Sequence, residues 1–160
     1  MRRAERWGWA AAFVMILTAP IVGCGGARVG SAPSGEEQHR ADWQENKPAT
    51  YSFTLDSQCG YMSLIGRFAV RVHDGDVARA EGLDESARVM IEQGFVDDVP
   101  TLDELLDELD RARLSDADRA EAEFDPTDGH PTLVEIDHDA NATDDEACYH
   151  ISDYRAGSHG

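Results

Sequence analysis

The chain has 160 residues, of which 32 are Asp or Glu and 14 are Lys or Arg, so its formal net charge at pH 7 is -18. A surface this negative repels phosphate backbones and anionic lipid head groups, which argues against nucleic-acid binding and against a polybasic membrane patch. Dispersed carboxylates also keep a protein soluble, and the charge is compatible with cationic partners. The length is that of one domain with an additional terminal segment.

The N-terminus has the pattern of an export signal. Three arginines in the first six residues precede an apolar or small stretch from Trp7 to Gly23, as in secretory signals. The stretch ends in Ile-Val-Gly-Cys at residues 21–24, which resembles the bacterial lipobox, whose cysteine receives a diacylglycerol before cleavage makes it the new N-terminus. We therefore expect residues 1–23 to be a lipoprotein signal peptide and Cys24 to carry acyl chains such as palmitate. Two alternatives stay open, an uncleaved anchor helix and a signal cut elsewhere, and both still export the domain.

The cysteine count supports export. With Cys24 used for lipid, Cys59 and Cys148 remain as an even pair, and such pairs form disulfides outside the reducing cytosol. The bridge closes a loop of about 90 residues and stabilises the fold by about 4 to 5 kcal/mol in the chain-entropy model. We expect an extracytoplasmic domain, lipid-anchored to the cell membrane of a bacterial envelope.

The segment after Cys24 has the composition of a linker. Residues 24–41 lack apolar periodicity and are rich in Gly, Ser and Ala, which predicts a flexible tether with a root-mean-square reach of about 20 to 25 Å. Residues 42–160 then form a single domain.

The first part of this domain predicts three strands. Apolar and polar residues alternate in the first two, and Asp74-Gly75 is a two-residue hairpin turn that places Val72 opposite Val77. The segment 84–99 is ambiguous, because helical spacing is interrupted by Gly94. The expected strands cover residues 51–56, 68–72 and 77–81.

A helix with clear end signals follows. Thr101 caps its N-terminus and Glu104 returns the hydrogen bond three residues later, with Pro100 just outside. Acidic residues cover one side, which indicates a solvated face. The buried stripe consists of Leu102, Leu105, Leu106 and Leu109.

The C-terminal part predicts a second hairpin and a last strand. Alternating residues 120–124 and 134–136 flank a turn that runs from Asp125 to Pro131. In the last strand, residues 148–154, we expect Tyr149 and Ile151 on one face, and Cys148, His150 and Tyr154 on the other. These elements predict an α+β fold, a small antiparallel sheet of about five to six strands with one main amphipathic helix packed on one face. The expected disulfide places the first and last strands close together.

The order of several short motifs resembles a family of uncharacterised bacterial lipoproteins, domain-of-unknown-function family 6174. Relatives usually have aromatic residues around the Gly-Pro turn where this chain has Asp128 and His130. The resemblance implies export and the fold, and it carries no established activity. The matching pieces are Tyr51-Ser52-Phe53 with Cys59, the hairpin from Val70 to Val77, the helix from Thr101 to Leu109, Phe124-Asp125-Pro126 with Gly129 and Pro131-Thr132, Ile136-Asp137, and Asp144-Asp145-Glu146 before Tyr149.

The sequence has no motif typical of an enzyme. It contains no Walker loop, GxGxxG turn, GxSxG elbow, HExxH or CxxC pair, and we expect no catalysis. Its histidines are scattered without helical ligand spacing, so we interpret them as surface or turn residues. They are His39, His73, His130, His138, His150 and His159.

One acidic segment has the pattern of a metal site. Six carboxylates fall in the twelve residues from Glu135 to Glu146, and the first, third and fifth ligand positions of a calcium loop match at residues 137–141. Ala142 stands where such a loop has glycine, and Cys148 stands where it has a bidentate glutamate. The alternative is a hairpin loop that its charges keep soluble. The candidate calcium ligands are Asp137, Asp139, Asn141, Asp145 and Glu146.

These observations favour a membrane-anchored envelope lipoprotein with a non-catalytic binding or interaction domain. Its expected partners are the membrane, through the N-terminal lipid, and an envelope protein or ligand, with no nucleic acid. The first alternative is a calcium-binding or calcium-stabilised extracytoplasmic domain that uses the loop 137–146, with calcium as its only expected cofactor. A third is a hydrolase with a dispersed site.

Overall fold

The computed structural model describes residues 35–59, 64–142 and 145–157. The expected signal peptide, Cys24 and residues 25–34 of the expected tether lie outside these ranges. Within the described residues, no helix is long and apolar enough to cross a membrane.

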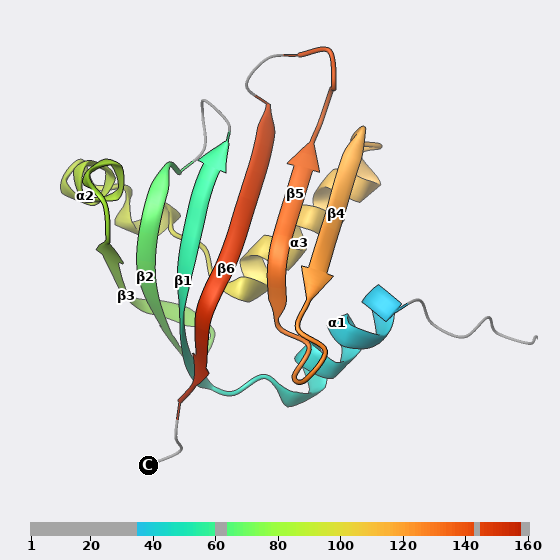
Figure 1. Ribbon diagram of the computed structural model, residues 1–160, viewed down its shortest axis with the longest axis horizontal. Coiled ribbons are helices and arrows are strands. Elements are labelled where there is room, and N and C mark those ends of the chain that lie inside the picture. The colour runs from blue at the N-terminus through green and yellow to red at the C-terminus, as the bar shows by residue number, and fades with distance from the viewer. Residues whose placement is uncertain (1–34, 60–63, 143–144, 158–160) are drawn as a thin grey trace, which may run out of the picture. The chain divides into compact units, whose positions relative to one another are not determined.

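Six antiparallel strands form one open sheet in the order β3-β2-β1-β6-β5-β4 (Figure 1). This arrangement confirms the predicted α+β class. The strands are β1 (Thr50–Cys59), β2 (Gly66–His73), β3 (Asp76–Gly82), β4 (Arg119–Phe124), β5 (Pro131–Asp137) and β6 (Glu146–Ala156). The helices are α1 (Gly35–Asn46), α2 (Glu85–Glu92) and α3 (Leu102–Leu114), with a 3-10 turn η1 at Phe95–Asp98.

The helix α3 lies behind the sheet in the view of Figure 1 and begins as predicted. The Thr101 hydroxyl accepts a hydrogen bond from the Glu104 N–H at 3.2 Å, and the Glu104 carboxylate accepts one from the Thr101 N–H at 2.7 Å. Such a cap stabilises a helix by about 1 kcal/mol. The predicted leucine stripe is fully buried and forms the centre of the core.

The β2–β3 hairpin also confirms its prediction. Val72 and Val77 are register partners, and both turn residues have positive φ, 52° at Asp74 and 91° at Gly75. This conformation matches the right-handed twist of the flanking strands, and Asp-Gly adopts it readily.

The ambiguous segment 84–99 contains the short helix α2. Asp84 caps this helix by accepting from the Ala87 N–H at 2.8 Å and also accepts from the Arg67 N–H of β2 at 3.0 Å. Ala87 is fully buried, and a Cβ on Gly66 would meet its backbone nitrogen at 2.6 Å. The glycine therefore allows α2 to lie directly on the sheet.

The helix α1 corrects the predicted domain boundary. It begins at Gly35, so residues 35–41 are helical and not part of a flexible tether. Trp43 is its one fully buried residue, and two of its charged side chains form ion pairs with α3. Since a single tryptophan gives no apolar stripe, periodicity could not reveal this helix. The ion pairs of α1 are Arg40–Asp110 and Glu36–Arg113, and Lys47, the residue after the helix, pairs with Asp103.

The first and last strands, β1 and β6, are neighbours at the centre of the sheet. Cys59 at the end of β1 is the register partner of Cys148 near the start of β6, and the two form the predicted disulfide across 89 positions of sequence. The bridge thus joins the two halves of the sheet.

A bulge in β6 changes which face its last residues occupy. The β1–β6 register shifts between Ser52 and Thr54, and Asp153 has a left-handed φ of 52°. The prediction that Tyr154 shares a face with Cys148 is therefore wrong. Tyr154 instead lies on the helix-covered side, where its ring centroid is 5.9 Å from that of Trp43.

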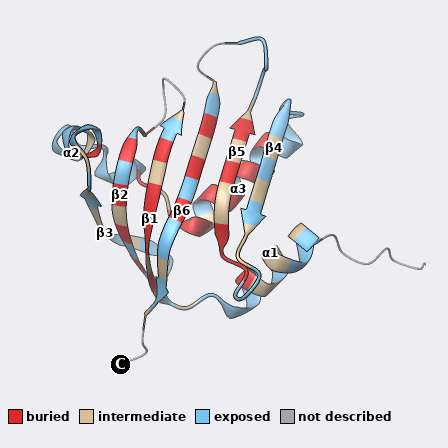
Figure 2. Cartoon of the chain, viewed as in Figure 1, coloured by how far each residue is buried: buried red, intermediate tan, exposed pale blue. Residues whose placement is uncertain are grey.

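All three helices contact the same face of the sheet. Trp43 of α1 packs against Tyr51 of β1 at 5.5 Å, Ala87 of α2 lies on Gly66, and the leucines of α3 fill the core between them. Buried and exposed residues accordingly alternate along the central strands (Figure 2). No helix of the described residues covers the opposite side, which we call the open face.

The central disulfide gives a direct stability test. Replacing Cys59 and Cys148 together with serine should lower the free energy of unfolding by about 3 to 5 kcal/mol, because the unfolded chain regains the entropy of a long loop. Urea unfolding measures the change. Reduced wild-type protein is the control, and it should unfold at the same urea concentration as the double variant. Equal midpoints for oxidised and reduced wild type would contradict the prediction.

Candidate functional site

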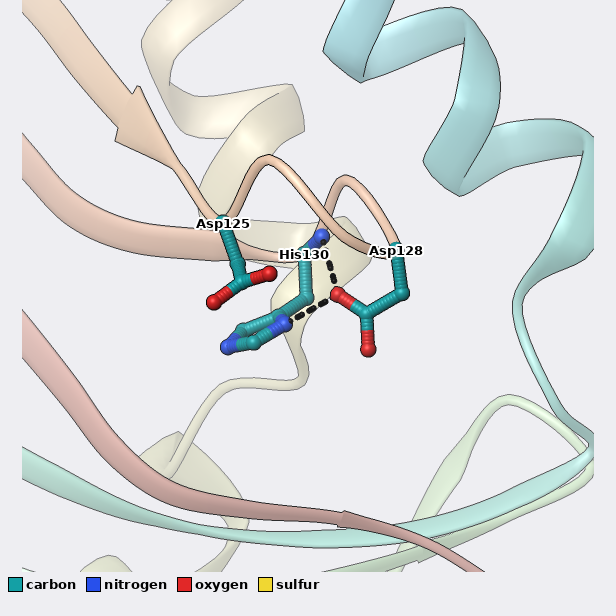
Figure 3. Close-up of side chains that lie close together, drawn as sticks. All are labelled: Asp125, Asp128 and His130. Atoms are coloured by element: carbon teal, nitrogen blue, oxygen red, sulfur yellow. Dashed lines mark hydrogen bonds and ion pairs between the residues drawn. The ribbon is translucent and has the colours of Figure 1, made fainter.

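Three potential metal-ligating side chains meet at the turn between β4 and β5. The ligand atoms of Asp125, Asp128 and His130 all lie within 4.8 Å of one another (Figure 3). Among the described histidines, cysteines and acidic residues, this is the one such group of three or more. The turn closes through the Asp125 N–H, which donates to the His130 carbonyl at 2.8 Å.

Hydrogen bonds within the turn engage both carboxylates. The Nδ1 atom of His130 lies 2.5 Å from Oδ1 of Asp128, which also accepts from the His130 N–H at 3.3 Å. Oδ1 of Asp125 accepts from the Thr127 N–H at 2.7 Å, and the hydrogen bonds from Thr127 hold the pKa of Asp125 below its usual range. A histidine with two carboxylates is a donor set that zinc accepts, but these hydrogen bonds organise the cluster without a cation.

His130 is also part of an aromatic cluster. Its ring stacks on Tyr154 of β6 with centroids 4.1 Å apart, and the residue is only 8 % exposed. Burial, with a smaller contribution from the charge of Asp128, raises the pKa of Tyr154 to about 12. His130 is therefore a turn residue, as predicted, but it is buried and does not lie on the surface.

Gly129 brings this turn against α1. Its φ is 74°, and a Cβ there would lie 2.4 Å from the His39 carbonyl oxygen and 2.9 Å from the Trp43 nitrogen. Only glycine allows both the backbone conformation and this close approach. The turn therefore links α1, the β4–β5 hairpin and β6, and we interpret the cluster as structural.

The predicted calcium ligands lie in two places. Asp137 at the end of β5 is the register partner of Glu146 at the start of β6, next to Asp145. Asp139 and Asn141 lie farther along the connecting loop, where the Asn141 N–H and side-chain amide both donate to Asp139 Oδ1. These bonds lower the pKa of Asp139.

The base of this loop contains two unusual carboxylates. One oxygen of Asp137 and one of Asp145 are shielded from solvent and accept no hydrogen bond from the described residues. The acidic side chains of the loop do not form a group of three with ligand atoms within 4.8 Å in this part of the chain. The structure therefore brings Asp137, Asp145 and Glu146 to one end of the sheet without gathering all five predicted ligands.

The open face has a hollow that the sequence did not predict. It lies over the small residues Ser52 and Ala69 and is bordered by Arg71, Arg79 and Glu81. Strand alternation indicates that such residues face away from the core. It does not indicate which strands are neighbours, so the hollow follows only from the observed sheet order.

A partly buried contact joins α3 to β6 on the covered side. The side chains of Glu108 and Tyr149 are hydrogen-bonded. Burial raises the pKa of Glu108, whereas Arg111 and this hydrogen bond act in the opposite direction. Burial likewise raises the pKa of Tyr149, and the charge of Glu108 adds to the shift.

Comparison with known proteins identifies the family. No curated protein and no solved structure matches the chain. A family of unknown function (DUF6174) matches residues 36–156, a range that begins in the first turn of α1 and ends at the last residue of β6. The match includes α1, in agreement with the corrected domain boundary. The chain therefore belongs to the family of unknown function DUF6174.

Proposed function

We propose that this chain is an extracytoplasmic lipoprotein, anchored to the cell membrane of a bacterial envelope through Cys24, whose domain binds a partner without catalysis. The lipobox-like residues 21–24 support the anchor. The Cys59–Cys148 disulfide supports export, because structural disulfides persist mainly outside the cytosol.

The open face is the observation that carries the binding role. The helices bury the other side of the sheet, so polar side chains of six strands remain together on one broad surface. Small residues, Ser52 and Ala69, form the floor of its hollow, and charged residues form its border. Polar groups that converge on a hollow fix the orientation of a bound ligand.

The anchor is tested by intact-mass analysis of protein extracted from membranes of the producing cells. We expect a chain that begins at Cys24 and carries a diacylglyceryl group, because the lipobox cysteine is the acceptor in this modification. Cys24→Ala should retain its signal peptide and gain no lipid mass. Wild-type protein with an unmodified Cys24 would contradict the anchor.

The binding face is tested by photo-crosslinking in the producing cells. A photoreactive residue at Ala69, on the open face, should give a discrete adduct on a denaturing gel. The same residue at Asp107, on the solvent side of α3, is the matched control and should give none. No adduct from position 69, or equal adducts from both positions, would contradict binding of a partner protein to this face.

A second candidate function is calcium binding at the base of the β5–β6 loop. The shielded oxygens of Asp137 and Asp145 support it, because burying a carboxylate oxygen without a donor is unfavourable. Calcium coordinates such oxygens and tolerates irregular geometry. Asp139 is a weaker ligand candidate, since its Oδ1 already accepts two hydrogen bonds from Asn141.

Thermal unfolding in excess EDTA and then in about 10 mM calcium tests this candidate. At an affinity of about 0.1 to 1 mM, calcium should raise the midpoint by roughly 5 °C or more. The rise should disappear in Asp137→Asn and Asp145→Asn and persist in Asp139→Asn and in the control Asp107→Asn. An unchanged wild-type midpoint would contradict calcium binding and favour the alternative, a loop that its charges keep soluble.

A further inference from the structure

A row of arginines crosses four strands of the open face. Arg79 is the register partner of Arg71 across β3 and β2, Arg71 is the partner of Ser52 on β1, and Ser52 is the partner of Arg155 on β6. Register partners lie on the same face of a sheet, about 5 Å apart. Arg71 and Arg155 therefore flank Ser52, with Arg79 next in the row.

Arg71 and Arg155, like Arg111 of α3, differ from the other described arginines and the lysine of this chain. Within the described residues, neither side chain forms an ion pair or a hydrogen bond. Arg88 donates to the Leu83 carbonyl, and Arg111 interacts with Glu108. The remaining cations have acidic partners, in the pairs Arg40–Asp110, Lys47–Asp103, Arg67–Asp56, Arg79–Glu81, Arg113–Glu36 and Arg119–Glu135.

This arrangement leaves two positive charges without acidic partners beside one serine. Acidic residues outnumber basic ones 32 to 14 in the chain, yet two guanidinium groups without carboxylate partners flank one serine. Arg71 also lies opposite Arg79, whose charge is paired with Glu81. An anion bound over Ser52 would lie between Arg71 and Arg155, at the edge of the hollow that Ser52 and Arg71 help to line.

The β6 bulge is what places Arg155 in this row. In a regular register, continued from the pair of Thr54 with Ser152, Tyr154 would lie opposite Ser52; the bulge at Asp153 puts Arg155 there instead. β-Bulges commonly redirect side chains at functional sites. The Asp153 carboxylate accepts a hydrogen bond from the Thr54 hydroxyl at 3.2 Å and leaves Arg155 unpaired.

We propose that Arg71, Arg155 and the Ser52 hydroxyl bind the phosphate group of a small soluble ligand. The proposal names the ligand class of the open face and rests on the binding role proposed above. Guanidinium groups bind phosphate through paired hydrogen bonds, and two of them match the charge of about -1.5 to -2 on a phosphate monoester. A lipid phosphate is disfavoured, because the net charge of -18 repels an anionic membrane surface.

The test is a titration of the folded domain with inorganic phosphate at low ionic strength, followed by NMR of the backbone amides and arginine side chains. We expect saturable shifts at Ser52, Arg71 and Arg155. Arg71→Ala and Arg155→Ala should each weaken binding about tenfold or more, as expected for the loss of charge-assisted hydrogen bonds. Added salt should weaken it as well.

Arg67→Ala is the matched control, because Arg67 is an exposed arginine of β2 that pairs with Asp56. It should leave phosphate affinity unchanged. Arg71→Ala should not lower the unfolding temperature, since Arg71 is exposed and forms no ion pair or hydrogen bond with the described residues, and this separates loss of binding from loss of folding. Equal weakening in all three variants would overturn the assignment.

Two further ligands identify the source of the anion. Acetate should bind at least about tenfold more weakly than phosphate, because it carries one charge and two oxygens. Vesicles of anionic phospholipid should not bind, and binding to them in preference to free phosphate would overturn the soluble-ligand assignment. Absence of saturation by millimolar phosphate would overturn the proposal itself, whereas adducts from position 69 would then still support the binding role.

Discussion

The fold depends on the pairing of its first and last strands. β1 carries the β2–β3 hairpin on one side, and β6 carries the β4–β5 hairpin on the other. The two hairpins form from neighbouring segments, but β1 and β6 meet across most of the chain, so their pairing carries the largest loop-closure cost. The disulfide reduces this cost by holding Cys59 and Cys148 together in the unfolded chain, and the core of α3 can then pack on one continuous sheet.

A single irregularity in β6 determines what lies on both faces at the end of that central pair. The left-handed residue Asp153 places Tyr154 on the covered side, where it packs with Trp43 and stacks on His130. It also places Arg155 on the open face, opposite Ser52. The anchoring of α1 and the proposed anion site therefore depend on the same bulge, and removing it should disturb both.

The sequence predicted the parts of this fold that local signals specify. The capping box at Thr101, the leucine stripe and the Asp74-Gly75 hairpin are each encoded within a few residues, and all are present. The sequence did not predict the features that depend on contacts between distant segments. α1 depends on one tryptophan and on ion pairs with α3, the face of Tyr154 depends on a bulge, and the arginine row depends on the strand order. None of these leaves a periodic pattern in the chain.

The distribution of charge along β6 explains how so acidic a protein can offer a site to an anion. The strand begins at Glu146, beside the acidic loop, and ends next to Arg155, a separation of about 30 Å at the rise of a β-strand. This distance is several times the Debye length of about 8 Å at physiological ionic strength. Of the acids near the row, Glu81 and Asp153 are engaged by Arg79 and Thr54, whereas Asp76, opposite His73, is exposed to solvent. An anion at Ser52 would still have Arg71 and Arg155 as its register neighbours, and the acidic loop affects its approach more than its binding.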